Sequence, residues 1–186
     1  MDVRPICQFP EPVLTRKTLK VTTFDASLPP LVEEMIETMR LANGVGLAAN
    51  QIGVPLMLCV IEIPEEGNAR VFVNPELVSQ EGERKLYEGC LSVTGYQGLV
   101  SRSERVKVRY QDLQGRKHRL TARDNLLAQA LEHEIGHLNG HLYLEHLVAR
   151  DAIWKLSEGP PPQYGREHTD EPDTVEATDD GLPAEK

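Results

Sequence analysis

Two histidines four residues apart are the first feature of the sequence that could do chemistry. They belong to the segment His133-Glu134-Ile135-Gly136-His137, an H-E-x-x-H pattern. On a helix, side chains at this spacing lie one above the other, so both imidazoles can bind one metal ion. The carboxylate of Glu134 could then take a proton from a water that the ion activates. Four-residue patterns also recur by chance, so this one needs support from other residues.

A hydrolytic metal ion usually has three protein ligands and one water, so a third ligand must come from elsewhere. Cys90 is the better candidate, because a thiolate is a strong ligand for a soft or borderline metal. Its neighbours in Glu88-Gly89-Cys90-Leu91-Ser92 predict a turn or a strand end facing a pocket. The alternatives are a buried structural cysteine at this position and a third ligand beyond the helix, at His141, Glu145 or His146.

A glycine-rich segment, Gly44-Val45-Gly46-Leu47-Ala48-Ala49-Asn50-Gln51, is the third feature. Its two glycines permit a close approach of the backbone, and its alanines permit tight packing. The amide of Gln51 could donate a hydrogen bond to an oxyanion. Taken alone, the segment fits a tight loop packed on a sheet equally well.

The elements that must position these residues predict an α+β fold, with antiparallel or mixed sheets packed around a central metal-binding helix. Connections are short and there is no regular βαβ alternation. Apolar periodicity and turn residues predict helices over Leu31–Ala42, Arg123–Asn139 and Leu144–Leu156, and strands over Leu56–Ile63, Arg70–Val73, Arg105–Tyr110 and Lys117–Thr121. Gly140 suits the end of the main helix, and Asn74-Pro75 suits the end of the second strand.

Composition divides the chain into a catalytic domain, residues 1–156, and an acidic, Pro-rich tail, residues 157–186. The tail has nine acidic and two basic side chains, which leaves the domain nearly neutral within a total charge of −9. We predict that the tail is disordered. Nothing here resembles a nucleic-acid-binding surface, no apolar run is long enough for a membrane span, and the N-terminus lacks the features of a secretory or transit peptide. A cytoplasmic protein is expected.

Together and in this order, the three segments resemble the peptide deformylase family, whose motifs are G-x-G-L-A-A-x-Q, E-G-C-L-S and Q-H-E-x-D-H-L-x-G. The resemblance covers about Arg4 to Leu156, and the first two motifs are complete. The third departs from the family pattern, with Glu132 in place of Gln and Gly136 in place of Asp. Thr94 and Gln97 stand where many members have Pro and Arg.

The resemblance implies that the chain removes the N-formyl group from the initiator methionine of newly made polypeptides and releases formate. Its partners would be N-formylmethionyl peptides, including nascent chains on ribosomes, with no direct binding to nucleic acid and none to membranes. Cys90, His133 and His137 would hold the metal. The ion would be Fe²⁺ by resemblance, although Zn²⁺, Ni²⁺ and Co²⁺ also suit a Cys/His/His set.

The resemblance also assigns the remaining roles. Glu134 would be the acid–base, and the Gln51 amide and the Leu91 N–H would stabilise the oxyanion. Helical spacing puts Leu126 and Ala130 on the face of His133, where they would line a pocket for the methionine side chain, with Val45 and Gly46 opposite. Two other functions remain open: a zinc peptidase that uses the H-E-x-x-H helix, and a catalytically weakened metal-binding relative.

Overall fold

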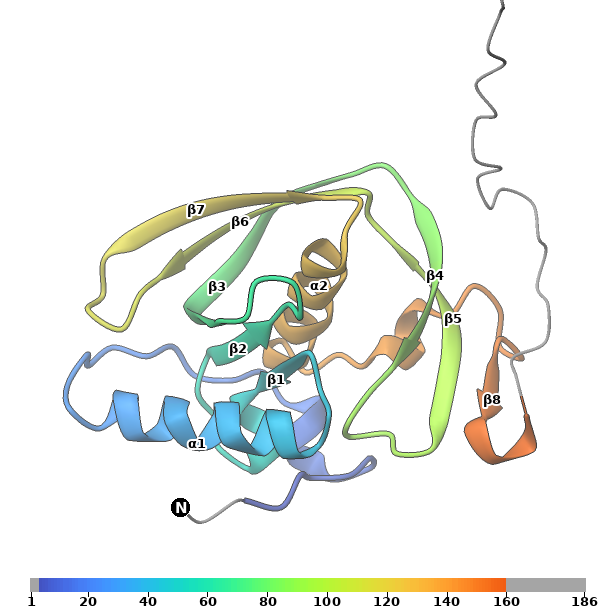
Figure 1. Ribbon diagram of the computed structural model, residues 1–186, viewed down its shortest axis with the longest axis horizontal. Coiled ribbons are helices and arrows are strands. Elements are labelled where there is room, and N and C mark those ends of the chain that lie inside the picture. Colours follow the sequence, from blue (N-terminus) through green and yellow to red (C-terminus); the bar gives the residue numbers. More distant parts are fainter. Residues whose placement is uncertain (1–3, 160–186) are drawn as a thin grey trace, which may run out of the picture.

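Two antiparallel sheets form the framework of the protein in the computed structural model, which describes residues 4–159 (Figure 1). The larger sheet has the strand order β1-β2-β3-β6-β7 and the smaller one the order β4-β5-β8. The strands are β1 (Gly46–Ala48), β2 (Leu58–Glu62), β3 (Ala69–Glu81), β4 (Arg84–Gly89), β5 (Tyr96–Arg102), β6 (Arg105–Gln111), β7 (Lys117–Arg123) and β8 (Ile153–Lys155). The α-helices are α1 (Leu28–Leu41) and α2 (Leu126–Leu138), and the 3-10 helices are η1 (Pro12–Thr15), η2 (Ala49–Ile52), η3 (Tyr143–His146) and η4 (Leu156–Glu158). The predicted α+β fold is confirmed.

Strand β2 lies between the two α-helices, which explains its continuous apolar sequence. Leu58 and Val60 belong to the core cluster that contains the buried face of α1, while Cys59 and Ile61 belong to the cluster around α2. Successive side chains of a strand point to opposite faces, so a strand covered on both faces must be apolar throughout. The prediction of a buried strand at this position is confirmed.

Helix α2 is the central element, because it packs against β1, β2, β3, β6 and β7. Its N-terminus is capped by Asn125, whose side-chain oxygen accepts a hydrogen bond from the Ala128 N–H at 2.9 Å. After the helix, Gly140 takes a positive φ of 83°, a conformation that favours glycine. The predicted start at Arg123 was three residues too early, because that residue ends β7.

The predicted end of the second strand at Asn74-Pro75 is wrong. Strand β3 continues to Glu81 through a register shift between Val73 and Glu76. Asn74 has a φ of 50°, and its side chain bonds both the N–H and the carbonyl of Val21 at 2.8 Å. A bulge of this kind lets a strand continue past a proline that has no N–H to donate.

The predicted helix over Leu144–Leu156 is also wrong. This segment contains η3, a turn, and β8, which pairs with β5 through Tyr96↔Lys155 and Gly98↔Ile153. Pairing with an available sheet edge outweighs the weak local helix preference of a short segment. The β4–β5 hairpin beside it was not predicted, apart from the turn or strand end at Cys90.

Most of the predicted tail, residues 160–186, lies outside the described residues. Of the part that is described, Ser157 and Glu158 belong to η4. No helix within residues 4–159 combines the length and the apolar character that crossing a membrane would require.

Candidate metal centre

Three ligand atoms from two elements meet beside helix α2. Cys90, directly after β4, has its Sγ 3.1 Å from the Nε2 of His137, which lies 3.1 Å from the Nε2 of His133. Within residues 4–159 these three side chains form a group whose ligand atoms all lie within 4.8 Å of one another. Ligands about 2.1 Å from a tetrahedral ion are about 3.4 Å apart, so the group suits one ion with little adjustment.

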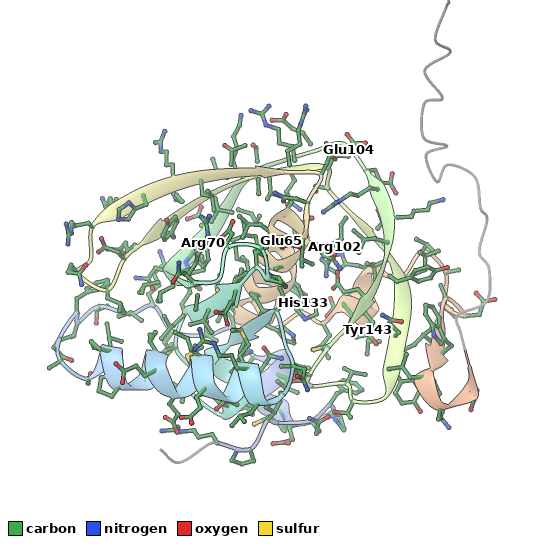
Figure 2. The ribbon with its side chains drawn as sticks, in the orientation of Figure 1. Glu65, Arg70, Arg102, Glu104, His133 and Tyr143 are labelled. Carbon is green, nitrogen blue, oxygen red and sulfur yellow. The ribbon has the colours of Figure 1, made fainter. Side chains whose placement is uncertain are left out.

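His133 is held by a buried ion pair. Its Nδ1 contacts Glu88 Oε1 at 2.5 Å, and the same oxygen accepts a hydrogen bond from Arg102 Nη2 at 2.5 Å. The Glu88 and Arg102 side chains are 4% and 3% exposed, so each buried charge requires the other to offset its loss of hydration. A proton on Nδ1 that is donated to Glu88 leaves the Nε2 lone pair free for a metal. Figure 2 shows Arg102 and His133 on neighbouring elements at this site.

The pKa values follow from these contacts. Burial opposes the ionisation of Glu88, but the hydrogen bonds and charges of His133 and Arg102 prevail and lower its pKa to about 2. Burial also opposes protonation of His133, yet Cys90 and Glu88 raise its pKa well above the usual value. Burial and the neighbouring charge on His133 lower the pKa of His137, which favours the neutral, ligating form.

Glu134 is buried on the same helix and reaches the site from the side of β1. Burial raises the pKa of its carboxyl to about 7. Its Oε2 has no hydrogen-bond partner among the described residues. The backbone of Gly46 comes so near that a Cβ there would overlap Oε1 and lie 2.8 Å from Cδ. Glu134 is therefore a confined, buried carboxyl whose pKa is raised and whose Oε2 has no partner among the described residues, features typical of functional sites.

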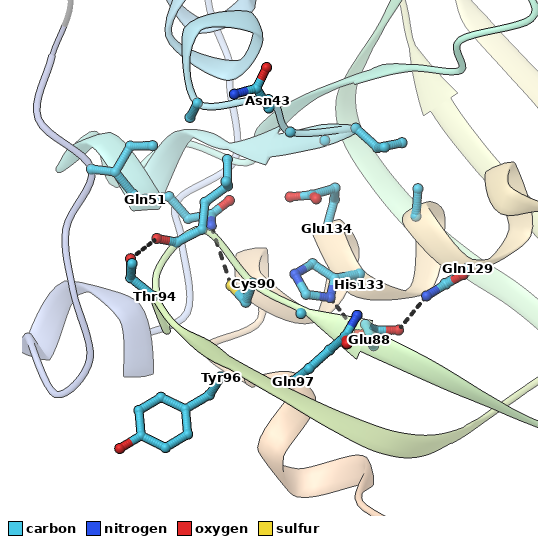
Figure 3. A pocket seen from close by; sticks show the side chains of 18 of the residues that line it. Asn43, Gln51, Glu88, Cys90, Thr94, Tyr96, Gln97, Gln129, His133 and Glu134 are labelled. Atoms are coloured by element: carbon cyan, nitrogen blue, oxygen red, sulfur yellow. Dashed lines mark hydrogen bonds and ion pairs between the residues drawn. The ribbon is translucent and has the colours of Figure 1, made fainter. Parts of the chain in front are cut away.

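Gln51 enters the site from η2. Its Oε1 accepts a hydrogen bond from the Ala48 N–H at 2.8 Å, which fixes the orientation of the amide. Its Nε2 consequently points at Cys90 Sγ, 3.7 Å away, and donates to Ser92 Oγ at 3.1 Å (Figure 3). The amide can thus donate a hydrogen bond beside the ligand atoms, as an oxyanion would require.

A cavity of about 680 Å³ opens in front of these groups. Nine of the ten predicted site residues line it: Val45, Gly46, Gln51, Cys90, Leu91, Leu126, Ala130, His133 and Glu134. The tenth, His137, is buried and contacts the cluster through Cys90 and His133. The structure brings the predicted residues to one place, while their individual roles stay predictions.

The positions that depart from the family pattern are accommodated. The buried carboxylate of Glu132 accepts hydrogen bonds from the N–H and hydroxyl of Ser103 at 2.9 and 3.0 Å, and from the Gln80 amide at 2.7 Å. These bonds join α2 to the β5–β6 turn. At Gly136, an added Cβ would find its nearest neighbour at 3.9 Å, the carbonyl of His141, so the site has room for a side chain.

Two residues that hold His133 in place, Glu88 and Arg102, were not predicted from the sequence. Glu88 was predicted only as part of a motif and not as a partner of His133, although a metal-ligating histidine usually donates its other ring N–H to a carboxylate, a carbonyl or water. The sequence around Arg102 does not indicate its contact with Glu88, because the β4–β5 hairpin brings the two residues together. The alternative ligands lie elsewhere: His141 Nδ1 contacts Glu145 at 2.8 Å, and both are about half exposed.

The fold and the site together define the class: an α+β hydrolase with a Cys/His/His group suited to one metal ion. The sequence profile of the polypeptide deformylase family matches residues 3–152. A peptide deformylase from Dehalococcoides mccartyi strain CBDB1 is 45% identical over 156 residues, which covers 84% of this chain and 93% of that protein. One from Bartonella henselae is 42% identical over 159 residues, covering 82% and 90%.

Solved structures agree. The peptide deformylase from Legionella pneumophila is 45% identical with a TM-score of 0.75, covering 78% of this chain and 86% of that one. The enzyme from Thermotoga maritima is 33% identical with a TM-score of 0.77, covering 80% and 100%. The chain belongs to the polypeptide deformylase family.

Proposed function

We propose that this chain deformylates N-formylmethionyl peptides with Cys90, His133 and His137 as metal ligands and Glu134 as the proton carrier. Membership of the family gives the reaction: hydrolysis of the N-formyl amide on the initiator methionine of a newly made polypeptide, with release of formate. The observation that supports the assignment of residues is that the ligand atoms of Cys90, His133 and His137 lie within 4.8 Å of one another, at a cavity lined by Cys90, His133, Glu134 and Gln51.

A divalent ion held by the three ligands would polarise the formyl oxygen and lower the pKa of a water. Glu134 would take a proton from that water while the oxygen of the water bonds to the formyl carbon. The Gln51 amide and the Leu91 N–H donate hydrogen bonds to the oxygen that becomes negatively charged. As the C–N bond breaks, Glu134 returns that proton to the departing amine. The formic acid that is left gives up the second proton of the water and becomes formate, and the peptide keeps a free N-terminus.

The proposed ion is Fe²⁺, with Zn²⁺, Ni²⁺ and Co²⁺ as the other ions that the Cys/His/His set accepts. Protein purified without oxygen should contain about one iron per chain, and exposure to air should remove activity through oxidation of the iron or the Cys90 thiolate. Zinc as the only metal in anaerobically purified, air-stable enzyme would refute the assignment of iron.

The proposed place of action is the cytoplasm, where nascent N-formylmethionyl chains leave ribosomes. The substrate is the peptide end itself, and we propose no direct contact with nucleic acid, because the domain is nearly neutral and the tail acidic. Sedimentation with purified ribosomes that carry no nascent chain tests this point. Binding that persists at physiological salt would contradict it.

Formate release from formyl-Met-Ala-Ser, measured anaerobically with metal supplied, tests the proposed activity. Glu134→Ala should keep its metal and lose turnover, whereas Cys90→Ala should lose metal and activity together. Cys7→Ala is the matched control, because Cys7 is a partly buried cysteine outside the cavity lining. Full activity of Glu134→Ala, or an unchanged metal content of Cys90→Ala, would overturn the assigned roles.

A further inference from the structure

The turn between β4 and β5 carries two of the groups that the proposed reaction uses, Cys90 and the N–H of Leu91. The turn is closed by a hydrogen bond from the Val93 N–H to the Cys90 carbonyl at 3.0 Å. Within the turn, Ser92 Oγ accepts a hydrogen bond from the Gln51 amide at 3.1 Å. A shift of this turn would therefore move the Leu91 N–H and disturb the Gln51 amide at the same time.

The side chain of Gln8, from the N-terminal segment, bridges this turn. Its Nε2 donates a hydrogen bond to the carbonyl of Leu91 at 2.9 Å, and its Oε1 accepts one from the hydroxyl of Thr94 at 3.0 Å. The Thr94 N–H also donates to that oxygen, at 3.4 Å. A carbonyl can only accept and an N–H can only donate, so these contacts allow one orientation of the Gln8 amide. Figure 3 shows Thr94 on the same side of the site as Gln51 and Cys90.

Gln8 is itself held in place by its neighbours in the N-terminal segment. Its own N–H donates to Glu11 Oε1 at 2.7 Å, and the N–H of Phe9 donates to the carbonyl of Ser92 at 2.8 Å. The N-terminal segment therefore lies along the turn and contacts it through both backbone and side chain before any substrate binds.

The contacts of Gln8 are exposed to solvent, which separates their effect on stability from their effect on geometry. Gln8 and Thr94 are both exposed, and water can replace a lost hydrogen bond at an exposed position, so folding stability depends on them only weakly. An oxyanion donor, in contrast, works only at a defined position. A proline at residue 94, as in many family members, would offer neither donor to Gln8, so the contact depends on the threonine of this chain.

We infer that Gln8 is a positioning residue for the reaction: together with Thr94 it holds the Leu91 backbone so that its N–H faces the oxyanion. The inference rests on the proposed function, in which Leu91 is one of two oxyanion donors. Gln8 holds the carbonyl of Leu91, and the Val93 N–H holds the carbonyl of Cys90, so the peptide groups on both sides of the Leu91 Cα are restrained. Gln8 thus acts through Leu91 and not on the reacting atoms.

The test is single-turnover and steady-state formate release from formyl-Met-Ala-Ser, with metal content measured for each variant. Loss of a whole oxyanion donor costs about 100- to 1000-fold in kcat, and Gln8→Ala misplaces one, so we expect kcat to fall about tenfold with KM and metal content unchanged. Gln8→Glu has nearly the same volume but no donor for the Leu91 carbonyl, so its kcat should fall as far.

The hydroxyl of Thr94 gives an independent check on the same contact. Thr94→Val should lower kcat about threefold, the effect of one neutral hydrogen bond, while Thr94→Ser keeps the hydroxyl and should match the wild type. The double variant Gln8→Ala/Thr94→Val should be no slower than Gln8→Ala alone, because both residues act through one backbone segment. Equal activity of Thr94→Val and wild type would refute the part assigned to Thr94.

Gln114→Ala is the matched control, because Gln114 is an exposed glutamine that does not line the cavity. If the wild-type enzyme releases no formate, the proposed function fails. If the wild type is active and Gln8→Ala keeps its kcat, only the positioning role is refuted. A raised KM at unchanged kcat would mean that Gln8 contacts the peptide directly, and a lower Tm and metal content at unchanged kcat per bound metal would mean a purely structural role. Either result would also refute it.

Discussion

Gly46→Ala tests whether the position of Glu134 limits the reaction. A Cβ at residue 46 would overlap Oε1 of Glu134 and lie 2.8 Å from its Cδ and 2.9 Å from its Cγ. Carbon atoms pack at about 3.5 Å, so the carboxyl must retreat by about 0.6 Å or more. Because a misplacement of about 1 Å can cost about 100-fold, we expect kcat to fall about 10- to 100-fold with little change in KM.

Single-turnover and steady-state formate release from formyl-Met-Ala-Ser, together with metal content, measure this effect. The fold should survive, because the Glu134 side chain can move while the β1 backbone stays paired with β2. Gly136→Ala is the control: it adds the same methyl group to a glycine near the site where 3.9 Å of space is available. A Gly46→Ala enzyme with full metal content and kcat within twofold of wild type would refute the argument.

Three further predictions concern stability. Gly136→Ala should raise the free energy of unfolding by up to about 1 kcal/mol, since alanine favours a helix and the site has room; an unchanged or lower Tm would contradict this. Asn125→Ala should lower the free energy of unfolding by about 1 kcal/mol, because the cap bond to the Ala128 N–H is lost. Urea unfolding measures this change, and an unaltered midpoint would show that the cap does not contribute to stability. In metal-stripped protein, Glu88 has a folded pKa of about 2, below the ordinary 4.5, so its contribution of about 3 kcal/mol is present above pH 4.5 and lost as pH falls toward 2. The urea midpoint of Glu88→Gln should therefore fall less than that of the wild type between pH 5 and pH 2.5. An equal fall of the midpoint in both proteins would refute the ion-pair argument.

Helix α2 and the candidate ligands that it carries could be proposed from the sequence because each depends on local chemistry. Histidines at 133 and 137 need only a helix to share a face, and the apolar run around Val60 needs only cover on both faces. Cys90 was preferred as the third ligand because of its thiolate and its turn residues, and the structure places its Sγ 3.1 Å from His137. These features depend on residues that are close together in the sequence, so periodicity and residue type are enough to predict them.

The features that escaped prediction depend on pairing between distant segments. Arg102 reaches Glu88 only because the β4–β5 hairpin folds them together, and Leu156 borders the cavity only because β8 adds to the edge of β5. The segment before Leu156 has enough local helix preference to mislead, and nothing near it shows that a sheet edge is open. Such contacts are decided by tertiary competition rather than by local propensity.

The site lies where the two sheets meet, and this has a consequence for how the metal acts on the fold. Gly46 and Gln51 come from the side of the larger sheet, while Cys90 follows a strand of the smaller one. Of the three residues in the candidate metal group, His133 and His137 lie on α2 and Cys90 does not. An ion bound to all three residues would therefore join the smaller sheet to the central helix, next to the Glu88–His133 contact that already links them. Because binding to the folded state alone stabilises it, the metal should act on the packing of the sheets as well as on the chemistry.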